Sequence, residues 1–277
     1  MPMPSLIITV DLEDHAIPPD PPRFEKALEP LLDLFDEHGV RATFFVVGEM
    51  VESWQGPLTN LANRGHEIGL HGFTHRYLRD LGPSVARHEL GLGLTVLRDC
   101  LGVERPGFRA PYCSLTADTP WAPPMLLEEG FSYSSSVIPS YNPIAGYPGA
   151  PQQPFLWECG LLELPAPVWG LGSFALPFLG GAYLRLAPAA LVGLAARGRS
   201  AESGDWSYSH PYDFDSTEPF FRRQGQSWFE ARLLFAFRSR MLNRFARFVA
   251  PGTPTLGEYA QATIARGGLP VFSPKNR

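Results

Sequence analysis

The sequence predicts an α/β fold in which parallel strands alternate with helices. The first observation is the aliphatic and β-branched run Ser5–Val10, which is typical of a strand buried on both faces of a parallel sheet. The second is that amphipathic helical segments separate this run from a second strand, Ala42–Val47, and from a third strand after Gly65. The length of 277 residues fits one barrel-sized domain or two small ones.

The helices of the first half of the chain follow these strands in order. Arg23–His38 carries apolar residues on one face and has Gly39 at its carboxyl end, which predicts an amphipathic helix. Pro57–Arg64 predicts a short helix. Ser84–Leu101 predicts a longer helix that begins at a serine cap and ends before a glycine.

The second half of the chain is less periodic. Three helices are expected there: Pro188–Arg197, Ser227–Val249 with room for a kink, and Thr255–Arg266. The segment Ser136–Pro154 is rich in proline, glycine and serine, and is expected to form a long surface loop that could act as a lid. The arginines of residues 227–249 are either solvated or face an anionic glycan or a lipid diphosphate.

The composition excludes several classes of protein. A formal net charge of −5 and a pI near 5.8 give no basic field for nucleic acid or anionic lipid. Cys100, Cys113 and Cys159 form no CxxC pair and are odd in number, which indicates reduced thiols. No segment has the pattern of a signal peptide or a membrane span, so we expect a cytoplasmic protein.

Acidic side chains follow the first strand directly. Asp11, Glu13 and Asp14 lie within four residues, although like charges that close repel one another and are costly to bury. The cluster is therefore either a solvated acidic loop or a metal or acid-base site. Ligands of parallel sheets collect at the carboxyl ends of the strands, which favours a site.

Histidines follow the third strand. The stretch Gly65–His75 holds three of the seven histidines of the chain. His71 should end the strand and His75 should lie one helical turn further on, where two imidazoles four residues apart can hold one cation. The alternative is that one histidine packs in the core while the others are solvated. A short strand before Pro111 then presents Arg109, which either orients a carboxylate of the acidic cluster or lies on the surface.

Together these segments resemble a known family, the polysaccharide deacetylases, also called the NodB-homology or carbohydrate esterase 4 group. The resemblance rests on five motifs in the family's order, from about Ile7 to Asp215: DLEDH, GHEIGLHGFTH, FRAPY, GFSYSSSVIP and YSHPYDFD. DLEDH, together with ELPAPV from Glu163 and LGGAYLRLAP from Leu179, further resembles the exopolysaccharide-locus subgroup.

The resemblance implies a single-domain α/β fold, a deformed (β/α)7-type barrel over residues 1–277 with a C-terminal helical extension at 218–277. It also implies a divalent metal, usually zinc, held by His71, His75 and one carboxylate of the first motif. That carboxylate is Asp14 or Glu13, and the sequence weakly favours Asp14. Asp11 is expected to act as the general base.

The resemblance extends to the remaining catalytic groups. His210 matches the histidine that protonates the departing amine, and the backbone N–H of Tyr112 matches a contributor to the oxyanion site. Arg109 matches the residue that orients the base. One departure concerns Ser134, because relatives commonly have an aspartate there that pairs with the late histidine. Trp169, Phe174 and Tyr183 either belong to the core or stack on sugar faces.

The function implied is metal-dependent removal of an N-acyl group, acetyl above all, from an amino sugar. The absence of an export signal favours a cytoplasmic substrate, such as a lipid-linked or nucleotide-linked amino sugar or an oligosaccharide. Two other hypotheses are hydrolysis of a small non-sugar amide or formamide, and glycan binding with weak catalysis on the same fold. No nucleic acid or integral membrane segment is expected.

Overall fold

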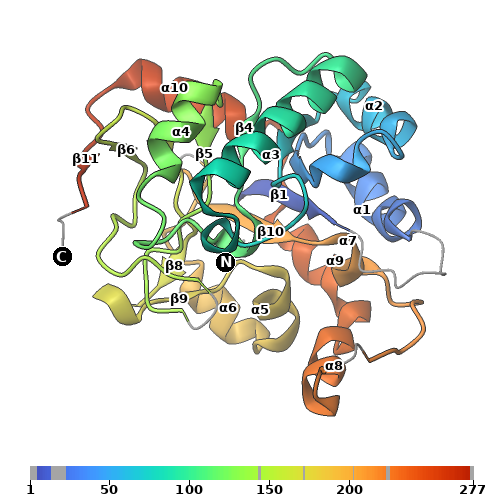
Figure 1. Ribbon diagram of the computed structural model, residues 1–277. Helices are drawn as coiled ribbons and strands as arrows, with labels where there is room; N and C mark the ends of the chain where they lie inside the picture. Colours follow the sequence, from blue (N-terminus) through green and yellow to red (C-terminus); the bar gives the residue numbers. More distant parts are fainter. Residues whose placement is uncertain are drawn as a thin grey trace.

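The computed structural model describes residues 5–13, 23–142, 145–170, 172–201, 203–222 and 225–274, and a nine-stranded sheet lies at its centre (Figure 1). The strand order is β10-β1-β2-β3-β4-β5-β7-β6-β11, and β8 and β9 form a separate pair. The strands are β1 Ile7–Leu12, β2 Thr43–Val46, β3 Glu67–Leu70, β4 Gly107–Phe108, β5 Tyr133–Ser134, β6 Phe155–Trp157, β7 Leu162–Glu163, β8 Val168–Trp169, β9 Leu176–Pro177, β10 Trp206–Ser209 and β11 Val271–Phe272.

The sheet confirms the predicted deformed barrel. Seven successive strands, from β10 through β1 to β7, are parallel, and β6 then pairs with β7 in the antiparallel direction. On the other side of β10, Gly180 forms an isolated parallel bridge with Tyr208. The segment after β9 therefore borders the opposite edge of the parallel strands.

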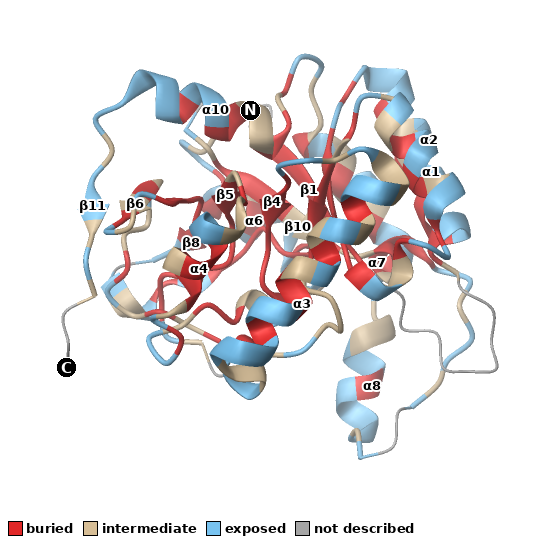
Figure 2. Cartoon of the chain, turned by 45° about the horizontal axis from the view of Figure 1, so that its top comes forward, coloured by how far each residue is buried: buried red, intermediate tan, exposed pale blue. Residues whose placement is uncertain are grey.

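Both faces of the first strand are buried, as its sequence predicts. Ile8, Val10 and Leu12 belong to the larger hydrophobic cluster between the sheet and its outer helices. Ile7 faces the other way and belongs to a second cluster inside the barrel. Because successive side chains of a strand point to opposite faces, Asp11 shares the inner side with Ile7. Figure 2 shows the buried sheet behind helices whose outer faces are exposed.

Helices surround this sheet, and those expected in the first half of the chain are present. They are α1 Phe24–His38, α2 Gln55–Asn63, α3 Leu78–Leu101, α4 Ala122–Glu129, α5 Gly181–Leu186, α6 Ala189–Ala195, α7 Pro211–Phe214, α8 Trp228–Phe235, α9 Met241–Phe245 and α10 Leu256–Arg266. Short 3-10 turns are η1 Gly48–Met50, η2 Pro111–Cys113, η3 Gly172–Phe174, η4 Arg238–Arg240 and η5 Ala246–Phe248. No helix in the described part of the chain is long and apolar enough to cross a membrane.

Three local predictions were wrong. Ser84 does not cap α3, because a first helical turn already begins at Leu78 and the non-helical Gly82 precedes the main helix. The helix expected over 227–249 is broken at Phe237, which adopts a left-handed conformation with φ of 58°. The loop expected on the surface from Ser136 buries its first residues, which include Val137 and Ile138.

The C-terminal helix closes the amino-terminal end of the barrel. Thr255 caps α10, and the Leu256 N–H donates to Thr43 Oγ1 at 2.8 Å. The Gly257 N–H donates to Glu67 Oε2 at 2.7 Å. Tyr133 Oη donates to the other oxygen of that carboxylate at 2.9 Å. Helix α10 is thus bonded to β2 and β3 at the end of the sheet opposite to His71. The division of the single domain into a barrel and a C-terminal helical extension at 218–277 stays a prediction.

The packing of α3 on β3 gives a test of the fold. A Cβ on buried Gly93 would lie 2.5 Å from Leu70 Cδ2, whereas a Cβ on Gly91 would meet nothing within 4 Å. Gly93→Ala should therefore lower the free energy of unfolding by about 1–3 kcal/mol through overpacking. Gly91→Ala, in the same helix, should raise it by roughly 0.5–1 kcal/mol. Urea denaturation measures both, and an equal effect of the two substitutions would contradict this packing.

Candidate metal and acid-base site

Glu13, His71 and His75 come together at the carboxyl ends of β1 and β3. One ligand atom from each lies within 4.8 Å of the other two, as a single metal ion would require. His75 Nε2 lies 2.6 Å from Glu13 Oε2. The structure thus places the histidine pair beside the acidic segment. Asp14, which the sequence weakly favoured as the third ligand, lies outside the described residues.

The two histidines are held by different backbone features. The His71 N–H donates to Val46 O at 2.8 Å, so this residue continues the β3 ladder. His75 was expected on a helical turn, and that was wrong: it follows a bend and has a left-handed φ of 56°. Gly72, with φ of 68°, begins this reversal. A Cβ there would lie 2.8 Å from Pro111 Cγ, so close packing as well as φ requires glycine.

The orientation of His71 leaves one nitrogen for a ligand. His71 Nδ1 lies 3.0 Å from the carbonyl oxygen of Arg109, and because a carbonyl only accepts, Nδ1 carries the proton. Nε2 then keeps its lone pair. Burial lowers the pKa of His71 to about 4, against the opposing charges of Asp11 and Glu13, so the ring is neutral at neutral pH. This pattern is usual for a metal-binding histidine.

Asp11 lies beside this group and is paired with Arg109. Arg109 Nη1 lies 2.6 Å from Asp11 Oδ1, and the guanidinium is fully buried. Its remaining donors bond Thr9 Oγ1 at 2.7 Å and the carbonyl and hydroxyl oxygens of Ser135, each at 3.1 Å. The guanidinium also lies 4.2 Å from the ring centroids of Phe45 and Trp206. The surface alternative for Arg109 was therefore wrong.

The carboxylates of the site are ionised. Burial alone would raise the pKa of Asp11, but the charge of Arg109, with those of nearby groups such as His210, lowers it below its ordinary value. Burial also opposes ionisation of Glu13, but the hydrogen bond from His75 and the charge of His210 together outweigh it, so the pKa of Glu13 falls far below its usual range. Two carboxylates and one neutral imidazole are ready to bind a cation or to accept a proton at neutral pH.

His210, at the end of β10, lies on the other side of Glu13. Its Nε2 is 3.7 Å from Glu13 Oε1. Its Nδ1 and its backbone N–H both donate to Asp213 Oδ2, at 3.2 Å and 2.9 Å. The ring stacks on Tyr212, whose hydroxyl donates to Glu13 Oε1 at 3.1 Å.

Asp213 is itself held from behind. Arg185 Nε on α5 donates to Asp213 Oδ1 at 2.8 Å, and both side chains are buried. A Cβ on Gly181 would overlap the Asp213 carboxylate, so this position needs glycine for its small size. Burial alone would lower the pKa of His210, but the hydrogen bond to Asp213 and the charges of Glu13, Asp213 and Asp11 raise it to about 9. The imidazole is therefore protonated at neutral pH.

Sequence reasoning missed Asp213 and Arg185, although both stand inside quoted motifs. The available signal was the spacing His-x-x-Asp at the start of a short helix, where the acid at the third helical position bonds back to the cap residue. Ser134, which stands where relatives commonly have an aspartate, donates to Ser136 Oγ at 3.0 Å. The partner of His210 thus comes from its own helix.

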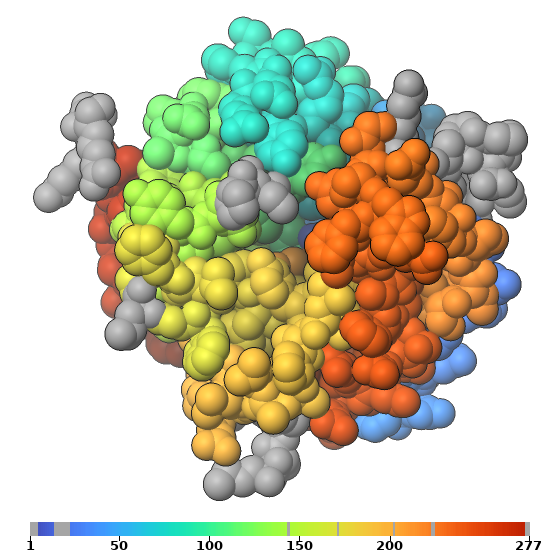
Figure 3. Space-filling model, turned by 90° about the horizontal axis from the view of Figure 1, so that it is seen from below, coloured from blue at the N-terminus to red at the C-terminus, as the bar shows by residue number. Residues whose placement is uncertain are grey.

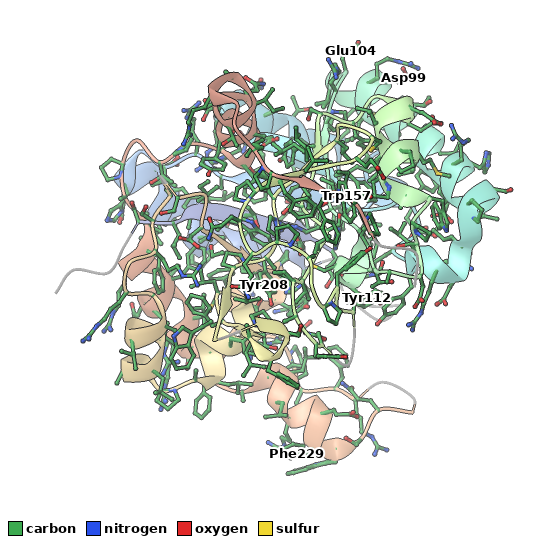
Figure 4. The ribbon with its side chains drawn as sticks, turned by 90° about the vertical axis from the view of Figure 1, so that its left-hand side faces the viewer. Asp99, Glu104, Tyr112, Trp157, Tyr208 and Phe229 are labelled. Atoms are coloured by element: carbon green, nitrogen blue, oxygen red, sulfur yellow. The ribbon has the colours of Figure 1, made fainter. Side chains whose placement is uncertain are left out.

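Tyr112 lies at the rim of this group of residues. Its φ is 58°, and its half-exposed ring stacks on Tyr77 at a centroid distance of 4.3 Å. The ring centroid lies 4.8 Å from that of His75. Figure 4 shows Tyr112 and Tyr208 at a similar level, with Phe229 of α8 well below them. The aromatic residues Trp169, Phe174 and Tyr183 are exposed rather than core residues, and a sugar-binding role for them stays a hypothesis.

Comparison with known proteins matches residues 3–122 to the family model described as polysaccharide deacetylase. Residues 135–253 match a domain of unknown function, DUF3473. Chitin deacetylase 1 of Cryptococcus neoformans var. grubii is 38% identical over 82 residues, 30% of this chain and 17% of that protein. Peptidoglycan-N-acetylglucosamine deacetylase of Bacillus cereus is 32% identical over 82 residues, 30% of each chain. The chain thus spans less than a third of these relatives.

One solved structure is similar over its whole length. A provisionally named polysaccharide deacetylase from Mycobacterium smegmatis superposes with a TM-score of 0.59 and 21% identity, and the match covers 100% of both chains. At this identity the likeness supports the fold. The site described above draws on both matched regions, because Glu13, His71, His75 and the Asp11–Arg109 pair precede residue 122, whereas Arg185, His210 and Asp213 follow residue 135.

Replacing Asp213 tests the electrostatics of His210. In the metal-free protein, Asp213→Asn should lower the pKa of His210 from about 9 toward its ordinary value, because burial is then opposed only by the charges of Glu13 and Asp11. In the wild type, the His210–Asp213 pair contributes fully to the free energy of unfolding below about pH 6.5, and this contribution is lost as pH rises through 9. The Asp213→Asn variant should not show that loss. NMR titration of the imidazole and urea denaturation measure the two effects. Asp36→Asn, a surface change, is the control and should leave the pKa of His210 unchanged. An unchanged His210 pKa in the Asp213→Asn variant would contradict the role given to Asp213.

Proposed function

We propose that the chain, whose residues 3–122 match the polysaccharide deacetylase family (the NodB-homology or carbohydrate esterase 4 group), is a metal-dependent N-deacetylase of an amino sugar in a glycan or glycan precursor. One observation carries the proposal. An ionised, arginine-paired Asp11 and a protonated His210 both lie beside the Glu13, His71 and His75 triad. This is a ligand set with a base and an acid beside it, which hydrolysis of an amide requires.

The donor set suits a divalent metal. Two imidazole nitrogens and one carboxylate leave positions for water and substrate, and zinc is the ion that such sets most often bind in hydrolases. His71 is neutral and its Nδ1 is bonded to a backbone carbonyl, while Glu13 is ionised, so few protons compete with a cation. The bound metal would polarise the amide carbonyl and lower the pKa of a water molecule toward ~7.

Asp11 is the proposed general base. Arg109 holds one carboxylate oxygen and keeps the group ionised, so Asp11 accepts the proton of the attacking water. Because the guanidinium is itself fixed by Thr9, Ser135 and two aromatic rings, the carboxylate has one preferred orientation. The Tyr112 backbone N–H is proposed to stabilise the oxyanion, as the family resemblance implies.

His210 is the proposed general acid. With a pKa of about 9 it carries a proton at neutral pH, which it donates to the nitrogen of the departing amine. Asp213 orients the ring through Nδ1, and Arg185 fixes Asp213. We propose that this pair supplies what an aspartate at the position of Ser134 supplies in relatives. The Ser134 departure then does not imply a weak enzyme.

The substrate class is an N-acetylated amino sugar. The names of the two relatives specify chitin and peptidoglycan N-acetylglucosamine. A lipid-linked or nucleotide-linked form of the sugar and a cytoplasmic location belong to the same proposal. Metal analysis of the purified protein, combined with a screen of acetate release over N-acetylated sugars, tests it. Release of formate from small amides, or sugar binding by the metal-loaded protein without turnover, would favour the alternatives.

The identity of the carboxylate ligand can be tested by a matched pair of variants. Glu13→Gln should lower the metal content of the purified protein about as much as His75→Ala does, because both remove a donor of the triad. Loss of one of three ligands should weaken metal binding by more than about 100-fold. This exceeds the roughly 10–100-fold loss that is typical when a residue that only hydrogen-bonds a ligand is replaced. Asp14→Asn should keep the metal. Metal loss in Asp14→Asn but not in Glu13→Gln would reverse the assignment.

The division between base and ligand gives a second test. Asp11→Asn should keep most of the metal while kcat/KM falls by ~10²–10⁴, because the amide oxygen still accepts from Arg109 but takes no proton from water. His71→Ala should lose metal and turnover together. Arg105→Gln, a surface change, is the control, and metal analysis beside acetate release provides both readouts. Equal metal loss in the Asp11 and His71 variants would refute the division of roles.

A further inference from the structure

Positive charge is concentrated in one segment of this acidic chain. Residues 218–249 contain seven arginines and two glutamates, and no lysine, aspartate or histidine, which gives them a net charge of +5. Since the whole chain carries −5, all other residues together carry −10. The overall charge therefore hides a local basic region that is strong enough to attract an anionic partner.

Two of these arginines are structural, and others are available. Arg238 is buried and pairs with Glu218, and Arg244 donates to the carbonyl oxygens of Leu184, Arg185 and Ala187. Arg232 and Arg240, by contrast, are exposed and pair with no carboxylate in the described part of the chain. Glu230 bonds the Ser227 N–H in a capping box. The exposed arginines thus keep their charge for an external ligand.

Exposed aromatic side chains lie among these arginines. Of the eight residues of α8 only Ala231 is buried, and Trp228 and Phe229 are 58% and 67% exposed. Arg232 lies over the rings of Phe220 and Trp228 at 4.8 Å and 4.7 Å, and Arg240 lies 4.6 Å from the ring centroid of Phe237. We call this surface the aromatic–arginine face; it consists of Phe220, Trp228, Phe229, Arg232, Phe237 and Arg240.

The position of this face relative to the barrel is plain in the figures. Helix α8 projects from the lower part of the molecule in Figure 1, and Phe229 is at the bottom in Figure 4. Figure 3, seen from below, shows the orange segment that contains α8 beside a hollow bounded by green and yellow segments. Arg185, which holds Asp213, also donates to Ala236 O at 2.6 Å at the end of α8. The face is therefore joined to the elements that position His210.

We propose that the aromatic–arginine face binds the surface of an anionic lipid bilayer. Tryptophan and phenylalanine beside arginine, on a short exposed helix, are the side chains that enter the headgroup region, where the rings leave water and the cations meet lipid phosphates. A soluble acidic polymer would pair with the arginines but would leave Phe229 exposed to water. A second copy of the same face would bring two positive surfaces together.

This placement has a consequence for substrate access. A face that binds a bilayer and is joined through Arg185 to Asp213 would hold the site close to the membrane surface. The proposal does not depend on the proposed deacetylase activity, because none of the six residues of the face belongs to the metal triad or the acid-base groups. Membrane binding and turnover can therefore fail or succeed separately.

Vesicle sedimentation with the full chain tests the proposal. The protein should sediment with vesicles of phosphatidylcholine and phosphatidylglycerol in equal parts at least about tenfold more strongly than with phosphatidylcholine alone. Raising salt from about 0.1 M to about 1 M should weaken this binding, because it screens the arginines. Emission of tryptophan should shift to the blue on binding and should lose that shift in Trp228→Ser.

Matched variants separate the two parts of the face. Trp228→Ser/Phe229→Ser and Arg232→Glu/Arg240→Glu should each weaken sedimentation with anionic vesicles at least about tenfold. Val85→Ser/Ile264→Ser and Arg79→Glu/Arg98→Glu change exposed aliphatic residues and exposed arginines elsewhere on the chain and should bind like the wild type. Circular dichroism checks that each variant folds.

Several results would overturn the proposal. They are a wild-type chain that does not sediment with anionic vesicles, and control variants that lose binding as much as the face variants. Tighter binding to soluble polyglutamate than to the vesicles would point to an acidic polymer instead. Dimerisation in analytical ultracentrifugation that the Trp228→Ser/Phe229→Ser variant abolishes, with no vesicle binding, would identify the face as a contact between copies of the chain.

Discussion

A buried ion pair between Asp11 and Arg109 organises the centre of this barrel. It joins the end of β1 to the end of β4, and Arg109 also bonds the backbone and hydroxyl of Ser135 after β5. Removing one partner of such a pair typically costs about 3–5 kcal/mol, because the other charge is left buried. The pair and its hydrogen bonds hold the carboxyl ends of β1, β4 and β5 together. The carbonyl oxygen of Arg109 also orients His71.

The same constraint accounts for the separation of charges in the site. Arg109 stabilises the ionised form of Asp11, burial keeps His71 neutral, and Asp213 holds the proton on His210. The two imidazoles, which have the same intrinsic chemistry, thus differ in protonation at one pH because their surroundings differ. The protonation of His210 depends on two features of α5. Arg185 pairs with Asp213, and Gly181 leaves room for the Asp213 carboxylate.

The two successive regions that match different family models contribute to one sheet and one site. The triad and Asp11 belong to the region that matches polysaccharide deacetylases, while His210, Asp213 and the aromatic–arginine face belong to the region that matches a domain of unknown function. Strand β10 of the second region pairs directly with β1 of the first, in parallel register from Ile7 opposite Trp206. The second region therefore completes both the sheet and the acid-base set.

The sequence by itself determined the parallel sheet, the helices around its first half, and the residues that meet at its carboxyl edge. Local periodicity and buried runs such as Ser5–Val10 are properties of neighbours in the chain, and strand ends converge whenever the strands are parallel. Tertiary structure alone decided that Glu13 reaches the histidines and that Arg185 holds Asp213 behind His210. The physical reason is that a carboxylate or a guanidinium acts through space over a few ångströms, and contacts between residues far apart in sequence leave no periodic signal in the chain.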